Sequence, residues 1–371
     1  MRILLDYRPA LVRRTGVGEY VHELARALAA APEPGDDIAL FSASWKDRLP
    51  ANAVPGLRTI DRRVPVRALN YAWHRLGWPP IERLTGDTFD VVQSLHPIAI
   101  PAKRAARIVT VHDLDFLDHP QRTRAEIRRD YPTLAPRHVR LADGVVVISQ
   151  TTAADVEQRL GVPSSRITVC TPGAPPWNRR TAEPGDGCIL FLGALEPRKN
   201  LGVLLDAYER LIKTSAVPPP RLVLAGKIGP DARLIQSRTV DRPLRDFVDL
   251  PGYIADSERQ ALYRRALLFV MPSHTEGFGM PVLEAMTVGV PVIAADRGAL
   301  PEVAGGAAKF FEPDDADGLT ALLAQLLTDE TERRRMRELG WARAAHYSWE
   351  ASARVLRRAW AQAVERRARR G

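Results

Sequence analysis

The stretch PSHTEGFGMPVLEAM, residues 272–286, decides how the second half of this chain folds. It follows the apolar run Ala266–Met271, which has the composition of a buried parallel strand. It then enters a predicted helix that ends near Gly289, with Pro281 at the first helical position, where proline is tolerated. The sequence therefore predicts a strand, a tight turn and a helix in succession.

The turn between this strand and helix carries two glycines, Gly277 and Gly279. They permit a tight bend and a close approach of the backbone to a ligand. The N–H groups of Phe278, Gly279 and Met280 are then expected to point out of a helix N-terminus. Such a terminus attracts phosphate or sugar oxygens.

Two carboxylates, Glu276 and Glu284, bracket the turn. They cannot share a helix face if Glu276 lies in the loop, so each can meet a different part of a ligand. Taken as residue types alone, they fit a capping glutamate and a solvated helix glutamate equally well.

This stretch resembles the E-x7-E signature of the family-4 retaining glycosyltransferases, within the pattern S-x-x-E-G-F-G-x-P-x-x-E-A-M, and is similar to the bacterial mannosyltransferase-like members. The resemblance implies an α/β fold of two Rossmann-like doubly wound domains facing a cleft, the GT-B architecture. It implies that Glu276 lies by the donor sugar and that Glu284 bonds the ribose hydroxyls. It also implies a nucleotide diphosphate sugar as co-substrate, with no metal and no other cofactor.

Length and composition agree with two domains. The chain has 371 residues and 45% hydrophobic content, which suffices for two α/β cores. We expect an N-terminal acceptor-side domain at 1–173, a proline- and glycine-rich linker at 174–187, a nucleotide-sugar-binding domain at 188–347, and a C-terminal helix at 348–371 that returns to the first domain.

Short apolar runs predict the strands of both domains. In order, we expect strands at 2–7, 38–42, 57–61, 90–95, 107–111, 144–149, 167–173, 188–193, 221–227, 247–253, 266–271, 291–295 and 309–312. Helical periodicity follows many of them, and three helices are expected at 315–329, 331–346 and 349–367. Strands that alternate with helices indicate parallel sheets.

The first domain offers a Gly16-x-Gly18 loop after its first strand and before an amphipathic helix. It is not a dinucleotide fingerprint, because Val21 stands where the third glycine would be, and this disfavours a nicotinamide dehydrogenase. It resembles the family's G-x-G loop, which implies that Gly16 and Gly18 face the donor diphosphate and the acceptor.

His112 and Asp113 follow the strand at 107–111, at the edge where parallel sheets bind ligands. A lone histidine is more often structural. The resemblance of T-V-H-D-L-x-F to the family places His112 beside the donor sugar. Asp113 and Asp115 also spell the D-x-D of metal-dependent glycosyltransferases, which we interpret as coincidence because that motif belongs to another architecture.

In the second domain, Arg198 and Lys199 stand between a strand and a helix, where two cations suit a diphosphate. The pattern G-x-L-x-P-R-K-N resembles the family's phosphate-binding motif, although Ala194 stands where many relatives have arginine. By the same resemblance, the backbone of Tyr253 and Ile254 binds the base, and residues 298–302 form the family's G-x-x-P-E turn.

The net charge of +9 is concentrated in residues 1–180 and in the tail from Arg354. It indicates anionic partners, of which we favour phosphate ligands and an anionic membrane surface, but it fits solubility in an arginine-rich proteome equally well. Nucleic acid is disfavoured because no recognised motif is present. Residues 62–84 mix arginines with tryptophan and tyrosine, which fits either an interfacial helix or a core-facing helix with solvated arginines.

No run of about 18 apolar residues is present, residues 1–6 resemble a strand more than a signal peptide, and the two cysteines, Cys170 and Cys188, fit a reducing compartment. We therefore expect a cytoplasmic protein, with peripheral attachment to the inner face of the membrane as an open alternative.

Together these features predict a retaining glycosyltransferase that moves a hexose to a glycan or lipid-linked glycan in cell-surface polysaccharide assembly, such as lipopolysaccharide. GDP-mannose is the first expectation for the donor. A UDP-sugar donor, a nucleotide-sugar epimerase and a non-catalytic nucleotide-binding protein are the alternatives. The set Glu276, Glu284, Arg198 and Lys199 argues against the last one.

Overall fold

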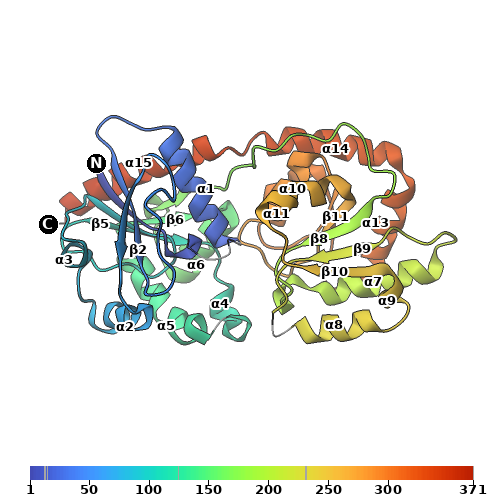
Figure 1. The fold of residues 1–371 in the computed structure, drawn as a ribbon, viewed down its shortest axis with the longest axis horizontal. Coiled ribbons are helices and arrows are strands. Elements are labelled where there is room, and N and C mark those ends of the chain that lie inside the picture. The colour runs from blue at the N-terminus through green and yellow to red at the C-terminus, as the bar shows by residue number, and fades with distance from the viewer. Residues whose placement is uncertain (12–13, 15, 124, 230–231, 371) are drawn as a thin grey trace. The chain divides into compact units, whose positions relative to one another are not determined.

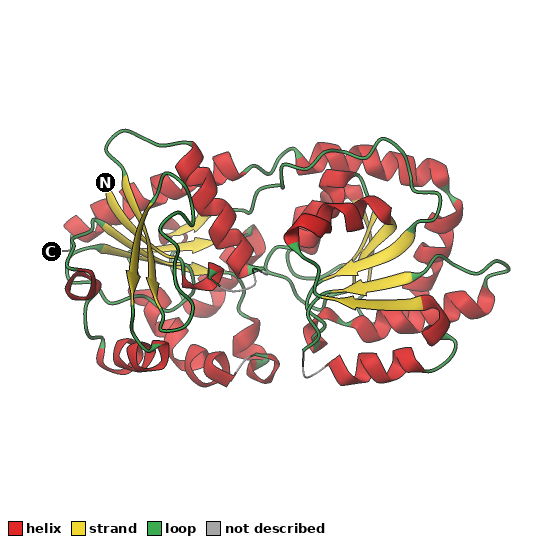
Figure 2. Ribbon diagram, viewed as in Figure 1, coloured by secondary structure: helices red, strands yellow, loops and turns green. Residues whose placement is uncertain are grey.

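The structure is a computed structural model that describes residues 1–11, 14, 16–123, 125–229 and 232–370. The chain divides into two compact units, which are treated separately below. Unit 1 comprises Met1–Gly173 and Ser348–Gly371, and unit 2 comprises Ala174–Tyr347. Each unit is built on one parallel sheet with helices on both faces (Figures 1 and 2).

Unit 1 holds a seven-stranded sheet in the order β3-β2-β1-β4-β5-β6-β7. The strands are β1 (Arg2–Asp6), β2 (Asp37–Ala43), β3 (Arg58–Arg62), β4 (Val91–Ser94), β5 (Ala106–Val111), β6 (Gly144–Val147) and β7 (Ile167–Val169). The helices around it are α1 (Val17–Ala30), α2 (Val66–Tyr71), α3 (Ile81–Thr85), α4 (Asp115–Asp118), α5 (Ala125–Leu141), α6 (Gln150–Leu160) and α15 (Trp349–Ala368).

Unit 2 holds a six-stranded sheet in the order β10-β9-β8-β11-β12-β13. The strands are β8 (Cys188–Leu192), β9 (Leu222–Ala225), β10 (Val248–Gly252), β11 (Ala266–Met271), β12 (Val292–Ala295) and β13 (Ala308–Phe311). The helices are α7 (Leu201–Thr214), α8 (Arg233–Val240), α9 (Leu244–Phe247), α10 (Asp256–Arg265), α11 (Met280–Val288), α12 (Leu300–Ala304), α13 (Ala316–Thr328) and α14 (Glu330–Ala344).

The strand order locates where ligands are expected in each unit. The order in which the strands are laid down reverses once in each sheet, between β1 and β4 in unit 1 and between β8 and β11 in unit 2. In doubly wound sheets the crevice at this switch point, at the carboxyl ends of the strands, receives the ligand. The predicted doubly wound α/β fold is confirmed by this order and by the parallel register of all the strand pairs.

Apolar burial explains why these elements pack as they do. The apolar residues on one face of the amphipathic helix α1 (Val21, Leu24, Ala25 and Leu28) are each 1% exposed, so that face belongs to the core. The α15 helix packs on the sheet of unit 1 and places the buried Trp360 Nε1 2.6 Å from Gln93 Oε1, to which it donates.

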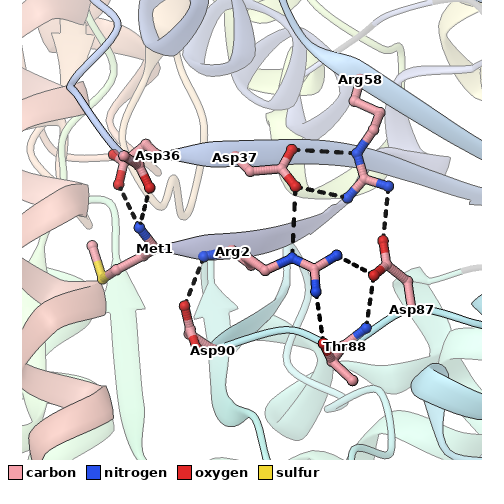
Figure 3. Close-up of polar contacts among 9 residues, drawn as sticks. Met1, Arg2, Asp36, Asp37, Arg58, Asp87, Thr88 and Asp90 are labelled. Atoms are coloured by element: carbon pink, nitrogen blue, oxygen red, sulfur yellow. Dashed lines mark hydrogen bonds and ion pairs between the residues drawn. The ribbon is translucent and has the colours of Figure 1, made fainter.

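Charged residues gather at the amino ends of the first strands of unit 1 (Figure 3). Arg58 pairs with Asp37 at 3.1 Å and with Asp87 at 2.8 Å, and Arg2 also pairs with Asp87. This network lies at the edge opposite to the one where parallel sheets bind ligands. Part of the positive charge of the chain is thus neutralised within the fold.

Several strands begin or end one or two residues away from the predicted positions, and two segments differ more. β7 ends at Val169 instead of residue 173, because its partner β6 ends at Val147, where the chain turns into α6. Residues 62–84 form short pieces, α2 and a π-helical turn at Ala72–Leu76, since prolines follow. This segment buries Trp73 but leaves Tyr71, Leu76 and Trp78 exposed.

Candidate functional site

The site of unit 2 is built at its switch point, from the loops that follow β8 and β11. After β8, a 3-10 turn at Pro197–Lys199 leads into α7 through Asn200, whose φ of 52° is left-handed. Asn200 Nδ2 donates to Pro313 O at 2.7 Å and fixes this turn. Arg198 and Lys199 are thereby held beside the loop that follows β11.

Glu276 lies in the loop after β11 and is 9% exposed. Its Oε1 accepts from Lys199 Nζ and, at 2.7 Å, from Ser273 Oγ. Its Oε2 accepts from Arg198 Nη1 at 3.2 Å, and the same Nη1 donates to Thr275 O. The structure thus brings three of the predicted residues into one cluster, and Ser273 joins them.

The charge of this cluster follows from its neighbours. Burial alone would raise the pKa of Glu276, but the charges of Lys199 and Arg198 and the hydrogen bonds to its carboxylate outweigh burial and lower it to about 2. Burial, together with the charge of Arg198, lowers the pKa of Lys199, and Glu276 opposes that change. Glu276 is therefore a carboxylate at neutral pH.

The turn from β11 into α11 has the expected form. Gly279 caps the helix with a φ of 101°, and Met280 is its first residue, so Pro281 stands at the second helical position and not at the first. This left-handed φ favours glycine, and a Cβ there would also lie 2.8 Å from Leu300 Cδ2. Phe278 is buried against the Tyr347 ring, and Gly277 precedes it in the loop.

The turn at 298–302 packs against the loop that contains Glu276. Ala299 N donates to Glu276 O at 3.0 Å. Gly298 has a φ of 58°, and a Cβ there would lie 2.8 Å from Glu276 O. The sequence signalled this turn only as a family-like motif, and its contact with Glu276 depends on the adjacency of β11 and β12.

Glu284, inside α11, is buried and bonded from a neighbouring helix. Tyr263 Oη donates to its Oε2 at 2.9 Å and also to Pro281 O, while Arg259 Nη1 lies 3.4 Å from its Oε1. Tyr263 and Arg259 both come from α10, whose role the sequence did not indicate. Tyr253 and Ile254, which follow β10, are half-buried.

In unit 1, the two glycines of the predicted loop, Gly16 and Gly18, are favoured over other residues for different structural reasons. Gly16 is the N-cap of α1 with a φ of 49°. Gly18 is buried, and a Cβ on it would lie 2.6 Å from Pro9 O, so a close approach of the backbone requires glycine there.

His112 follows β5 and donates from Nε2 to Leu95 O at 3.1 Å, with its ring edge-on to Tyr20 at 5.3 Å. Because a carbonyl can only accept, Nδ1 is the acceptor nitrogen of the neutral ring. Burial lowers the pKa of His112, so the neutral form prevails at neutral pH. Asp113 Oδ1 accepts from Asp115 N at 3.2 Å, a local turn.

The sequence prediction missed a polar group at the switch point of unit 1. Asp6, at the end of β1, is fully buried and bonds Arg8 Nη2 at 2.7 Å and His96 Nε2 at 3.1 Å. Burial would raise the pKa of Asp6, but Arg8 and His96 together hold it well below its usual value. The sequence did offer a signal for this group, because Asp6 and His96 stand at the ends of the predicted strands 2–7 and 90–95.

Comparison with known proteins agrees with this geometry. The family model described as "Glycosyl transferases group 1" matches residues 177–342, and the one described as "Glycosyltransferase Family 4" matches residues 14–176. The chain is 29% identical to O-antigen chain mannosyltransferase B of Escherichia coli, over 94% of this chain and 97% of that protein.

Two further relatives cover almost the whole chain. MMP alpha-(1->4)-mannosyltransferase of Mycolicibacterium hassiacum is 28% identical over 99% of each chain. The structure of a sucrose-phosphate synthase from Thermosynechococcus elongatus superposes with a TM-score of 0.76, at 22% identity, over 97% of this chain and 98% of that one. The last likeness concerns the fold alone.

Proposed function

The chain belongs to glycosyltransferase family 4, with the GT-B fold and retaining chemistry of that family. On this premise, we propose that it transfers mannose from GDP-mannose to a glycan or lipid-linked glycan acceptor in the assembly of a cell-surface polysaccharide. The observation that carries the proposal is the Lys199–Glu276–Arg198 cluster at the switch point of unit 2.

Glu276 acts on the sugar through its charge and not through proton transfer. A group with a pKa of about 2 is a weak base and holds no proton to donate near neutral pH. A fixed carboxylate can instead accept hydrogen bonds from sugar hydroxyls and stabilise the positive charge that develops on the ring as the glycosidic bond breaks.

Arg198 and Lys199 serve the leaving group. Negative charge builds on the β-phosphate as the bond to the sugar breaks, and two cations fixed beside Glu276 meet it without reorganisation. The backbone N–H groups of Phe278–Met280 add neutral donors in unit 2. In unit 1, the N–H groups of Gly16–Gly18 are donors of the same kind. Loss of one such donor costs about 3 kcal/mol of barrier, or roughly a hundredfold in rate.

Glu284 binds the ribose, and the backbone of Tyr253 and Ile254 binds the base. Tyr263 and Arg259 each hold one carboxylate oxygen of Glu284, which orients the remaining lone pairs toward hydroxyl donors.

In unit 1, neutral His112 offers Nδ1 to a sugar hydroxyl beside Asp113, and the Asp6–Arg8–His96 group contributes to acceptor recognition.

Peripheral attachment to an anionic membrane is part of the proposal. Among the described residues, no helix combines the length and apolarity needed to cross a bilayer. The support is two exposed tryptophans in unit 1, each with an arginine over its ring. Arg63 lies over the Trp45 ring at 4.7 Å and Arg83 over the Trp78 ring at 5.4 Å, and both tryptophans are about half exposed.

Sedimentation with vesicles tests the attachment. The protein should co-sediment with anionic vesicles at low salt and much less with zwitterionic ones, and Trp78→Ala should weaken the interaction. The matched control is Trp360→Phe, which changes a buried tryptophan of the same unit. No sedimentation with anionic vesicles at low salt would refute membrane attachment without affecting the proposed reaction.

A donor panel tests the reaction. GDP-mannose, UDP-glucose, UDP-GlcNAc and dTDP-rhamnose are compared for binding and slow hydrolysis, each with and without Mg²⁺. Metal-independent binding of GDP-mannose alone supports the proposal. Binding of a UDP sugar instead would leave the assignment as a glycosyltransferase in place but would overturn GDP-mannose as the donor. Conversion of the donor to an epimer without any acceptor would favour a nucleotide-sugar epimerase.

A further inference from the structure

The turn that precedes α11 depends on one side chain for its packing. Gly277 and Gly279 have no side chain, and Phe278 between them is 2% exposed. The Phe278 ring is thus the side-chain anchor of the turn, between two positions that contribute only backbone. The packing of this ring therefore helps to fix the direction of the N–H groups at residues 278–280, which are assigned to the donor.

The Phe278 ring packs against Tyr347, the last residue of unit 2. The two rings are edge-on, with 5.4 Å between their centroids and an interplanar angle of 86°, a favoured arrangement for aromatic pairs. The backbone of Tyr347 is held on both sides, because its N–H donates to Ala344 O at 3.1 Å and its carbonyl O accepts from Ala174 N at 3.0 Å. Tyr347 therefore presents its ring to Phe278 from a fixed backbone.

The hydroxyl group of Tyr347 is fixed as well. It accepts from Arg343 Nη2 at 2.8 Å and donates to Val303 O at 3.4 Å. Burial raises the pKa of Tyr347, although the charge of Arg343 opposes this change, so the hydroxyl keeps its proton at neutral pH. Arg343 also donates from Nε to Val303 O at 2.9 Å and from Nη2 to Glu302 O. The phenol is thereby fastened to α12.

Helix α12 also follows the turn that holds the backbone of Glu276. The turn at 298–302 leads into this helix, and Ala299 N donates to Glu276 O at 3.0 Å. Leu300 and Val303 are 0% exposed, so the helix is anchored in the core of unit 2. The carboxylate and the N–H groups of the neighbouring turn therefore share one rigid support.

We propose that Tyr347 is a positioning residue of the donor site, whose ring holds Phe278 so that the N–H groups of residues 278–280 face the β-phosphate of the donor. This inference rests on the proposed function, which supplies the ligand. Tyr347 acts through Phe278 and is not itself assigned a contact with the substrate. Loss of its ring would leave the N–H donors without a fixed direction, and donors that must reorganise stabilise the developing charge less well.

Calorimetric titration with GDP and GMP, and with UDP and UMP, tests this role, because each pair differs only in the β-phosphate. Tyr347→Leu should weaken binding of the diphosphate about five- to tenfold and leave binding of the monophosphate unchanged. Tyr347→Phe keeps the ring that contacts Phe278 and should restore most of the loss. Tyr208→Leu is the matched control, because this buried tyrosine of unit 2 bonds Pro220 O, and it should not change the ratio of the two affinities.

Hydrogen exchange of the nucleotide-free protein gives a second readout that needs no ligand. In Tyr347→Leu, peptides that contain residues 277–280 should exchange faster than in wild type, while peptides of β8 and β9 should keep their protection. If Tyr347→Leu does not fold, Arg343→Met takes its place in both experiments, because it removes the bonds that hold the Tyr347 hydroxyl and the end of α12.

The results separate two kinds of failure. If wild-type protein binds neither GDP nor UDP, the proposed function fails and the role of Tyr347 fails with it. If wild-type protein binds a nucleoside diphosphate but Tyr347→Leu leaves the ratio of diphosphate to monophosphate affinity unchanged, only the positioning role is overturned. The same holds if Tyr347→Phe is as impaired as Tyr347→Leu, or if the exchange of residues 277–280 is unaffected.

Discussion

Lys199 Nζ donates a hydrogen bond to Glu276 Oε1, and the two residues are 77 positions apart in the sequence. The contact exists because β8 and β11 are neighbours in the sheet, so that the loops at their carboxyl ends meet. It joins a cation assigned to the diphosphate with the carboxylate assigned to the sugar. The pair is nearly inaccessible to solvent, with the two side chains 7% and 9% exposed.

Glu276→Gln and Glu284→Gln should separate turnover from donor binding. Glu276→Gln removes the charge that we assign to the transition state, so kcat should fall by about a hundredfold with a small change in donor KM. Glu284→Gln should mainly raise the donor KM. Steady-state kinetics with a saturating acceptor measure both. Wild-type turnover in Glu276→Gln would mean that its assigned role is wrong.

The Lys199–Glu276 pair should show strong coupling in stability. Lys199→Met leaves a buried carboxylate and Glu276→Gln leaves a buried ammonium, and each should cost about 3 kcal/mol of unfolding free energy. The double variant should cost clearly less than the sum of the two. Urea unfolding of the four proteins measures the coupling, and additive effects would contradict an energetic interaction between the two charges.

Tyr263→Phe should weaken donor binding without unfolding the protein. It removes the hydrogen bond to Glu284 Oε2 and leaves the buried ring in place. The donor KM should rise several-fold, in keeping with the loss of one hydrogen bond to a charged group. Tyr208→Phe is the matched control, because this tyrosine is equally buried but bonds Pro220 O. Equal effects of the two changes would indicate a general loss of stability.

Gly298→Ala should displace the Glu276 loop. The left-handed φ of 58° disfavours alanine, and its Cβ would lie 2.8 Å from Glu276 O. Turnover should fall at least about tenfold, since small displacements of catalytic groups are costly. Gly306→Ala has open space around its Cβ and should retain full activity. Activity of Gly298→Ala equal to that of wild type would argue against a rigid loop.

Stability should fall as the solution is acidified from pH 6.5 towards 4. Burial lowers the pKa of His138 from its ordinary value of 6.5 to about 4, so the unfolded chain takes up a proton in this window before the folded one does. His138 Nδ1 accepts from Ala99 N at 3.2 Å, and protonation would break that bond.

The slope attributable to this residue is at most about 1.4 kcal/mol per pH unit. Denaturant unfolding of wild type and His138→Gln between pH 4.5 and 7.5 measures it. The unfolding free energy of His138→Gln should depend less steeply on pH than that of wild type. Substitution of an exposed histidine, as in His346→Gln, should not have this effect. Parallel curves for wild type and His138→Gln would contradict a buried neutral imidazole.

The sequence alone determined the strands and helices and the residues of the turn between β11 and α11. Apolar runs predicted each of the described strands, and the residues around Gly279 predicted the loop and helix of the site, because both signals depend on neighbours within a few positions. The position of Glu276 in the loop and of Glu284 in the helix was predictable for the same reason.

Only the tertiary structure decided which charges meet. Asp6 and His96 are 90 positions apart, and the order of the strands sets their contact, as it does for Lys199 and Glu276. The burial of Arg180, whose Nη1 donates to Ala266 O, likewise has no local signal. Burial removes the water that would otherwise screen each charge, so the partners brought together by the sheet fix the ionisation of Glu276 and the chemistry of the site.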